Sequence, residues 1–155
     1  MLNTLTPRYT SLLIAATALA TLVGAWIFEY AGFLPCELCL EQRWAYYVGV
    51  PLALIVGIWN PGRIRLALVA MTLLWLGSAV FGVYHSGVEW GWWQGPTSCS
   101  GAGGTLGTGD GLPDLSKPAV MCNEAAIRIF GLSLAGWNAV ISAALALLAI
   151  HAARK

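Results

Sequence analysis

Charged side chains are scarce in this sequence. Only 10% of its 155 residues are Asp, Glu, Lys or Arg, whereas 58% are hydrophobic, and the formal net charge is +1. A soluble domain carries about 25% charged residues, so most of the surface of this chain does not face water. The small net charge also excludes the basic surface that binds nucleic acid. The composition therefore favours a polytopic membrane protein of one domain, with no nucleic-acid partner.

Two further absences exclude common cofactor sites. The glycines of this chain form no Gly-x-Gly-x-x-Gly pattern within a strand–helix unit, so no dinucleotide-binding fingerprint is present. Covalent haem attachment requires His directly after a C-x-x-C pair, and here Leu40 occupies that position. The sequence therefore contains neither a dinucleotide-binding fingerprint nor a covalent haem motif.

Long stretches without charged residues predict the helices. They cover residues 12–28, 44–59, 66–88 and 129–150. A membrane-spanning helix needs roughly 17–25 mostly apolar residues, so the second helix must begin near residue 39 or 40. The runs are continuous and rich in Leu and Ala, which is typical of helices rather than of barrel strands. We predict an all-α bundle of four transmembrane helices, at about residues 11–30, 40–59, 64–86 and 130–152, with outer loops at about 31–39 and 87–129.

Charge asymmetry predicts the orientation of the bundle. Five basic residues lie in the N-terminal tail, the middle connection and the C-terminal tail, namely Arg8, Arg63, Arg65, Arg154 and Lys155. These segments share one side of a four-span bundle, and the positive-inside rule places them in the cytoplasm. The first apolar run exceeds the roughly 7–15 residues of a signal-peptide core, so we expect it to be retained. Both termini are therefore expected to be cytoplasmic.

All four cysteines lie in the two predicted outer loops. Cys36 and Cys39 form a tight pair, and Cys99 and Cys122 a loose one. Two dithiols that face one compartment favour electron relay by thiol–disulfide exchange, although four cysteines allow three connectivities. The six glycines between Cys99 and Cys122 favour a mobile loop that lets the two pairs meet. Structural disulfides are the alternative. We expect no metal, because structural zinc sites usually use two short-spaced pairs.

Two basic side chains are candidates for binding an electron acceptor. The second helix is expected to begin within the tight pair, so Cys39 lies where the helix N-terminus favours a thiolate. Arg43 lies one turn further on the same face, and its forked donors suit a carbonyl of a lipid-soluble oxidant. The alternative is that Arg43 reaches the interface or pairs with Glu37, Glu41 or a lipid phosphate. His85 could assist quinone binding or proton transfer, or simply form a hydrogen bond at the interface.

The sequence resembles the DsbB family of disulfide bond formation proteins of bacterial inner membranes. The main match to the family pattern C-x-L-C-x-x-Q-R is Pro35-Cys36-Glu37-Leu38-Cys39-Leu40-Glu41-Gln42-Arg43. Further similar segments are Tyr84-His85 with Glu89, the Trp-rich residues 90–94 before Cys99, and residues 130–138. The resemblance covers essentially the whole chain. One departure is the stretch between the loose cysteines, which is richer in glycine than the amphipathic segment of the family.

The resemblance implies a quinone-dependent oxidoreductase that reoxidises a periplasmic thioredoxin-fold dithiol oxidase of the DsbA type. Cys99 would form a mixed disulfide with that donor, and Cys122 would then attack the tight pair at Cys36. Cys39, released as a thiolate, would pass electrons to ubiquinone or menaquinone with the help of Arg43. The membrane quinone pool and a DsbA-like protein are thus the implied partners.

Two other functions compete with this expectation. A structural membrane subunit could use the same cysteines to staple its outer loops. An enzyme similar to vitamin K epoxide reductase shares the quinone and thiol chemistry, but would place its reactive C-x-x-C at a later helix.

Overall fold

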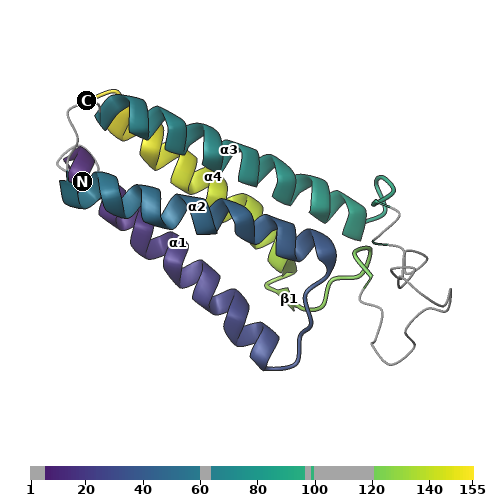
Figure 1. Ribbon diagram of the computed structural model, residues 1–155. Coiled ribbons are helices and arrows are strands. Elements are labelled where there is room, and N and C mark those ends of the chain that lie inside the picture. Colours follow the sequence, from purple (N-terminus) through teal and green to yellow (C-terminus); the bar gives the residue numbers. More distant parts are fainter. Residues whose placement is uncertain (1–5, 60–63, 97–98, 100–120) are drawn as a thin grey trace, which may run out of the picture.

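Four helices form a bundle in the computed structural model, which describes residues 6–59, 64–96, 99 and 121–155. The helices are α1 (Pro7–Tyr30), α2 (Glu37–Trp59), α3 (Ile64–Glu89) and α4 (Leu134–Ala153). The start of α1 and the end of α4 lie at one end of the bundle, whereas the α1–α2 connection lies at the other (Figure 1). The protein is therefore mostly helical, as its composition predicts.

Three of the described helices are long and apolar enough to cross a membrane, namely α1, α3 and α4. These three helices identify a multi-pass membrane protein. The fourth, α2, carries Gln42 and Arg43 near its start and Pro51 within it, so it is less uniformly apolar than the others. A membrane crossing by α2 stays a prediction.

The first helix begins at Pro7, five residues before the start of the uncharged stretch. Thr6 is its N-cap, and the Thr6 hydroxyl accepts a hydrogen bond from the backbone N–H of Tyr9 at 3.5 Å. Pro7 occupies the first helical turn, where its missing N–H leaves no hydrogen bond unmade. The capping residues, rather than the apolar run, therefore set the start of α1.

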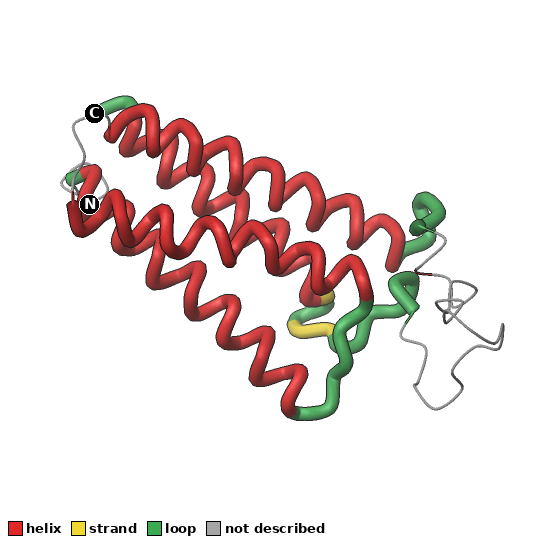
Figure 2. The backbone as a smooth tube through the Cα atoms, in the orientation of Figure 1, coloured by secondary structure: helices red, strands yellow, loops and turns green. Residues whose placement is uncertain are grey.

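A short hairpin delays the start of the fourth helix. Strands β1 (Arg128–Ile129) and β2 (Leu132–Ser133) pair in antiparallel register, and α4 begins at Leu134 rather than at about residue 130. Both turn residues have positive φ, 52° at Phe130 and 83° at Gly131, as a tight two-residue hairpin requires. The Ser133 hydroxyl then caps α4 by accepting from the Gly136 N–H at 3.1 Å. Figure 2 shows the strands of this hairpin in yellow, directly before α4.

The core of the bundle contains large side chains on α3 and small ones where helices approach closely. Trp75, Met71 and Leu68 of α3 are fully buried. In the second half of α3, a Cβ atom placed on Gly82 would lie 2.8 Å from the backbone nitrogen of Ala139 in α4. Small residues at such positions let membrane helices pack backbone to backbone. Gly82 therefore sets the distance between α3 and α4.

The Gly82→Ala substitution should destabilise the bundle. The new methyl group meets the Ala139 backbone, which cannot move aside as a flexible side chain would, so we expect a loss of about 1–2 kcal/mol. Chemical unfolding in detergent micelles, followed by circular dichroism, measures this loss. Gly77→Ala is the matched control on the same helix, because its Cβ would meet nothing within 4 Å. Equal effects of the two substitutions would contradict this account of the α3–α4 packing.

Candidate redox site

The loose cysteine pair is a disulfide. Cys99 is joined to Cys122, with Cα atoms 5.1 Å apart, and both residues are buried. The backbone N–H of Cys122 also donates to the carbonyl oxygen of Cys99 at 3.2 Å, which holds the two segments together. The glycine-rich stretch between them, residues 100–120, lies outside the described residues. Of the possible connectivities, the structure therefore contains 99–122.

The tight pair is reduced and lies at the start of α2. Cys36 directly precedes the first helical residue and Cys39 lies in the first turn, with the two Sγ atoms 2.6 Å apart. Hydrogen bonding with Cys39, followed by burial, raises the pKa of the Cys36 thiol. Of the two sulfurs, Cys36 therefore holds its proton more tightly.

Both pairs belong to one cluster of buried residues at the end of the bundle that holds the α1–α2 connection. Cys36, Cys99 and Cys122 are buried in it together with Leu38 and Val88, and Cys39 packs against it. Residues far apart in the sequence are thus brought together by the α1–α2 connection, the end of α3 and the segment before β1. An oxidised couple lies beside a reduced one, which is the arrangement that thiol–disulfide exchange requires.

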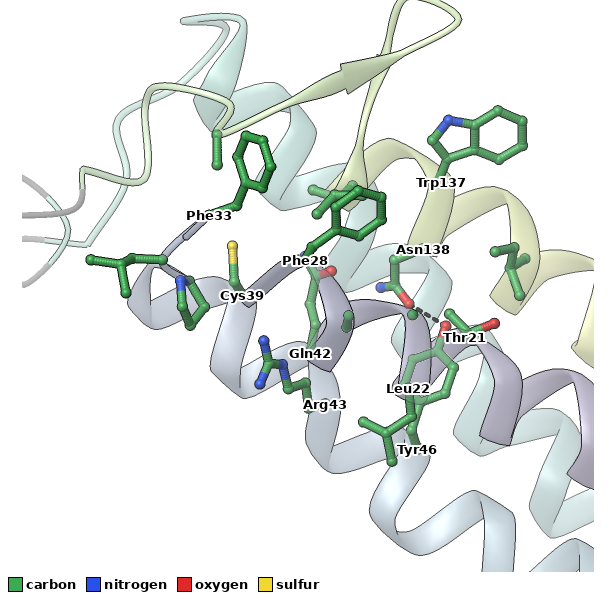
Figure 3. A pocket seen from close by; sticks show the side chains of 18 residues that line it. Thr21, Leu22, Phe28, Phe33, Cys39, Gln42, Arg43, Tyr46, Trp137 and Asn138 are labelled. Carbon is green, nitrogen blue, oxygen red and sulfur yellow. Dashed lines mark hydrogen bonds between the residues drawn. The ribbon is translucent and has the colours of Figure 1, made fainter. Parts of the chain in front are cut away.

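A cavity of about 270 Å³ opens beside the tight pair. Its walls come from α1, α2 and α4 and are mostly apolar, with Phe28 and Phe33 on one side (Figure 3). Cys39 and Arg43 both line it. Tyr46 and Asn138 form part of its floor, where the Tyr46 hydroxyl donates to Asn138 Oδ1 at 2.6 Å. An apolar cavity with a few polar groups is typical of a site for a small, largely apolar ligand.

Arg43 pairs with an acidic residue of another helix. Its Nη1 atom donates to Oε2 of Glu29, in the last turn of α1, at 2.6 Å. The sequence suggests Glu37 or Glu41 as a partner, but the structure has neither, because the α1–α2 connection brings Glu29 to the face that carries Arg43. One alternative from the sequence was that Arg43 extends to the membrane interface. The Arg43 side chain is only 12% exposed, so it does not extend away from the bundle in that way. One of its five N–H donors is accounted for by this bond.

His85 lies beside the tight pair and is absent from the cavity lining. Its Nε2 atom is 3.5 Å from Cys36 Sγ, and its Nδ1 atom is 2.8 Å from the side-chain nitrogen of Gln42. The nearest carboxylate oxygen, Oε1 of Glu89, is 3.8 Å from Nε2. The structure therefore separates the two basic candidates, since Arg43 lines the cavity with Cys39 and His85 contacts Cys36.

Two polar residues of the site are not singled out by sequence reasoning. Gln42 contacts His85 and Asn138 contacts Tyr46, and both are buried. Gln42 lies three residues after Cys39, on the same helix face, so this spacing could have identified it as a residue of the site. Asn138 is an isolated amide within the long apolar run that forms α4. A polar residue at such a depth usually marks a functional or packing site.

Three potential metal ligands meet at the tight pair. The donor atoms of Cys36, Cys39 and His85 lie within 4.8 Å of one another. Two thiolates on a tetrahedral zinc ion are about 3.8 Å apart, given Zn–S bonds of about 2.3 Å. The 2.6 Å separation of the two sulfurs is much shorter than that. The geometry therefore suits a sulfur pair that opens and closes better than it suits a zinc ion.

A helical membrane bundle that holds a disulfide beside a dithiol is typical of membrane proteins that take part in disulfide bond formation. Residues 7–152 match the family described as "Disulfide bond formation protein DsbB". The chain therefore belongs to the DsbB family.

Two relatives are similar over most of their length. The chain is 29% identical over 135 residues to "Disulfide bond formation protein B" of Aromatoleum aromaticum, which covers 82% of this chain and 80% of the relative. It is 28% identical over 141 residues to an uncharacterized protein of Rickettsia prowazekii, covering 85% of this chain and 79% of the relative. No solved structure matches the chain.

Proposed function

We propose that this protein is a quinone-dependent oxidoreductase that reoxidises a DsbA-like periplasmic dithiol protein. The observation that carries this proposal is the order of the groups at the outer end of the bundle. The Cys99–Cys122 disulfide packs in one cluster with the reduced Cys36–Cys39 pair, and Cys39 in turn lines an apolar cavity with Arg43. Electrons can pass along this order from a protein donor to a lipid-soluble acceptor.

The proposal includes a location in the bacterial inner membrane, with α2 as the fourth span and both termini in the cytoplasm. The start of α1 and the end of α4 share the end of the bundle opposite the cysteines (Figure 1). Arg8, Arg65, Arg154 and Lys155 lie at that same end. The positive-inside rule then places the cysteines in the periplasm, where disulfides persist.

The sulfur exchanges conserve bonds and electrons at each step. A thiolate of the donor attacks Cys99, which breaks the Cys99–Cys122 bond and releases Cys122 as a thiolate. Cys122 attacks Cys36 of the closed tight pair, and Cys39 leaves with the negative charge. The second thiolate of the donor attacks the mixed disulfide, which forms the donor disulfide and releases Cys99. Cys99 then attacks Cys122 and frees Cys36, which leaves the tight pair reduced, as the structure has it. Each exchange forms one S–S bond and breaks one.

The cavity fits the ring of a quinone, either ubiquinone or menaquinone. A bound quinone would accept two electrons and two protons when the tight pair closes. Cys39 faces the cavity, where it is the electron donor, and the remaining N–H groups of Arg43 suit a carbonyl oxygen. The apolar walls, including Phe28 and Phe33, exclude water from the thiolate. The donor set therefore suits an uncharged ring with polar oxygen atoms.

Purified protein in detergent micelles, a reduced thioredoxin-fold donor and a soluble quinone analogue test the proposal. We expect one quinol for each donor disulfide formed, measured by the loss of quinone absorbance and by titration of free thiols. A structural subunit with stapled loops would form no quinol under these conditions. That result would overturn the proposed function.

The Arg43→Ala substitution should slow quinone reduction about 100-fold, because it removes hydrogen-bond donors aimed at an oxygen that gains charge. The reaction of the donor protein with Cys99 should keep its rate, since Arg43 lies on the cavity side of the tight pair. Stopped-flow measurement of the two half-reactions separates these effects. Arg43→Lys keeps the charge but loses the planar fork, so we expect an intermediate rate. Equal losses in both half-reactions would show that Arg43 is architectural.

A further inference from the structure

Within the part of the chain that the structure describes, no cationic side chain contacts Cys36, one sulfur of the proposed relay. Cys36 changes its bonding partner in each cycle and must carry negative charge when it is released and when it attacks Cys39. It is only 5% exposed, so water cannot stabilise that charge. The backbone N–H of Cys39 donates to Cys36 Sγ at 3.3 Å, but one hydrogen bond does not compensate a buried anion for its lost hydration. Arg43 lines the cavity beside Cys39 and has Glu29 as its ion-pair partner, so some other group must serve Cys36.

We propose that His85, held by Gln42, is the hydrogen-bond donor that stabilises the Cys36 thiolate. His85 Nε2 lies 3.5 Å from Cys36 Sγ, within hydrogen-bond distance of sulfur, and the imidazole ring is 1% exposed. The ring comes from α3, whereas Cys36 and Gln42 lie at the start of α2. The two helices therefore fix the donor and the sulfur relative to each other. This role rests on the proposed function, since it assigns a task within that reaction.

Gln42 determines which ring nitrogen of His85 carries the proton. Its amide nitrogen is 2.8 Å from Nδ1, and an amide N–H can only donate. Nδ1 is then the acceptor, and the single proton of the neutral ring is on Nε2, which faces Cys36. A neighbour that fixes the tautomer in this way also fixes the role of the other nitrogen. Cys36, His85 and Gln42 thus form a thiol–imidazole–amide chain across two helices.

The other ionisable groups around Cys36 do not replace His85. Cys39 is the partner sulfur and opposes a second negative charge. Glu89 lies one turn after His85, with Oε1 3.8 Å from Nε2, which is longer than the contact between Nε2 and Cys36 Sγ. Arg128 of β1 interacts electrostatically with Glu89. Among the described residues, the donor that faces Cys36 from another helix is therefore His85.

The proton balance is compatible with this role. When the tight pair closes, Cys36 forms a bond to Cys39 and two electrons leave for the quinone. Two protons accompany them in the net reaction, in which a dithiol and a quinone give a disulfide and a quinol. His85 retains its own proton throughout, so it stabilises charge without consuming or producing a proton.

Alkylation of Cys36 tests the proposal without any donor or quinone. In a Cys39→Ala background with the Cys99–Cys122 disulfide intact, Cys36 is the one free thiol of the chain. Its rate of reaction with iodoacetamide, measured by mass spectrometry across a pH series, reports the fraction present as thiolate. Adding His85→Ala should raise the midpoint of this pH profile by about one unit. The rate at pH 7 should fall about tenfold, while the plateau at high pH should not change.

Three further variants in the same background make the test specific. His85→Gln carries an N–H group at a similar reach and should restore most of the rate. Gln42→Leu should shift the midpoint in the same direction by less, because it frees the tautomer but leaves the ring. Ser86→Ala, on the same turn of α3, should shift nothing. An unchanged midpoint in both His85→Ala and Gln42→Leu would overturn the proposal, whether or not quinol formation in the intact protein is confirmed.

Discussion

Replacing Cys39 by serine should abolish quinol formation in the assay with donor protein and quinone. Serine is a poor nucleophile at neutral pH and forms no disulfide, so the pair could neither open toward Cys122 nor close onto an acceptor. We expect a fall in turnover of about three orders of magnitude or more, as for other nucleophiles that act within a unit. The loss of quinone absorbance at a fixed concentration of reduced donor measures it.

The reaction of the donor with Cys99 serves as the control for the Cys39→Ser variant. The Cys99–Cys122 disulfide is separate from the changed residue, so one round of attack by the donor on Cys99 should survive. Trapping with a donor that lacks its second cysteine would reveal this mixed disulfide on a non-reducing gel. Quinone reduction at the parental rate in this variant would contradict the assignment of Cys39 as the sulfur that serves the cavity.

Replacing Cys122 by serine should separate the two halves of the reaction. Catalytic oxidation of the donor should cease, because no second sulfur remains to carry electrons from Cys99 to Cys36. The tight pair and the cavity are unchanged, so a chemically reduced tight pair should still close when quinone is added, at the parental rate. A single-turnover experiment in a stopped-flow instrument, with thiols counted before and after, measures both outcomes.

Stability must be measured for Cys122→Ser because the lost disulfide also constrains the unfolded chain. The disulfide joins residues separated by 23 positions, and such a crosslink contributes about 3 kcal/mol in the loop-entropy model. Thermal unfolding monitored by circular dichroism gives the temperature range in which the variant stays folded. Loss of quinone-dependent closure within that range would show that the outer pair supports the cavity structurally, contrary to the proposed relay.

Much of the fold could be predicted because the membrane imposes a simple rule on sequence. Long apolar runs become helices, since a helix satisfies its backbone hydrogen bonds within itself. The residues at which the helices begin and end were harder to predict from the sequence. Thr6 starts α1 through a capping bond, and the hairpin turn at Phe130 and Gly131 delays α4. A non-glycine residue at positive φ is uncommon, so the local sequence did not predict that Phe130 would be a turn residue.

Cys36, Cys39 and Arg43 could be proposed as site residues from sequence because their signal is local, a short spacing at the start of a helix. Their partners could not. Glu29 reaches Arg43 from 14 positions away, and Gln42 reaches His85 from 43 positions away. Such pairs depend on how the helices pack, which periodicity alone does not specify. For the same reason the sequence left three roles open for His85, namely quinone binding, proton transfer and a hydrogen bond at the interface, and did not predict its contact with Cys36.

The Arg43–Glu29 pair has a consequence for the kind of molecule that can enter the cavity. An unpaired guanidinium in an apolar wall would hold water tightly, which disfavours the binding of apolar ligands. Its positive charge would also attract anions. With Glu29 at 2.6 Å, the two opposite charges cancel before any ligand arrives. A neutral molecule diffusing laterally out of the lipid therefore meets a wall of no net charge. Its binding should then depend little on the salt concentration of the surrounding buffer.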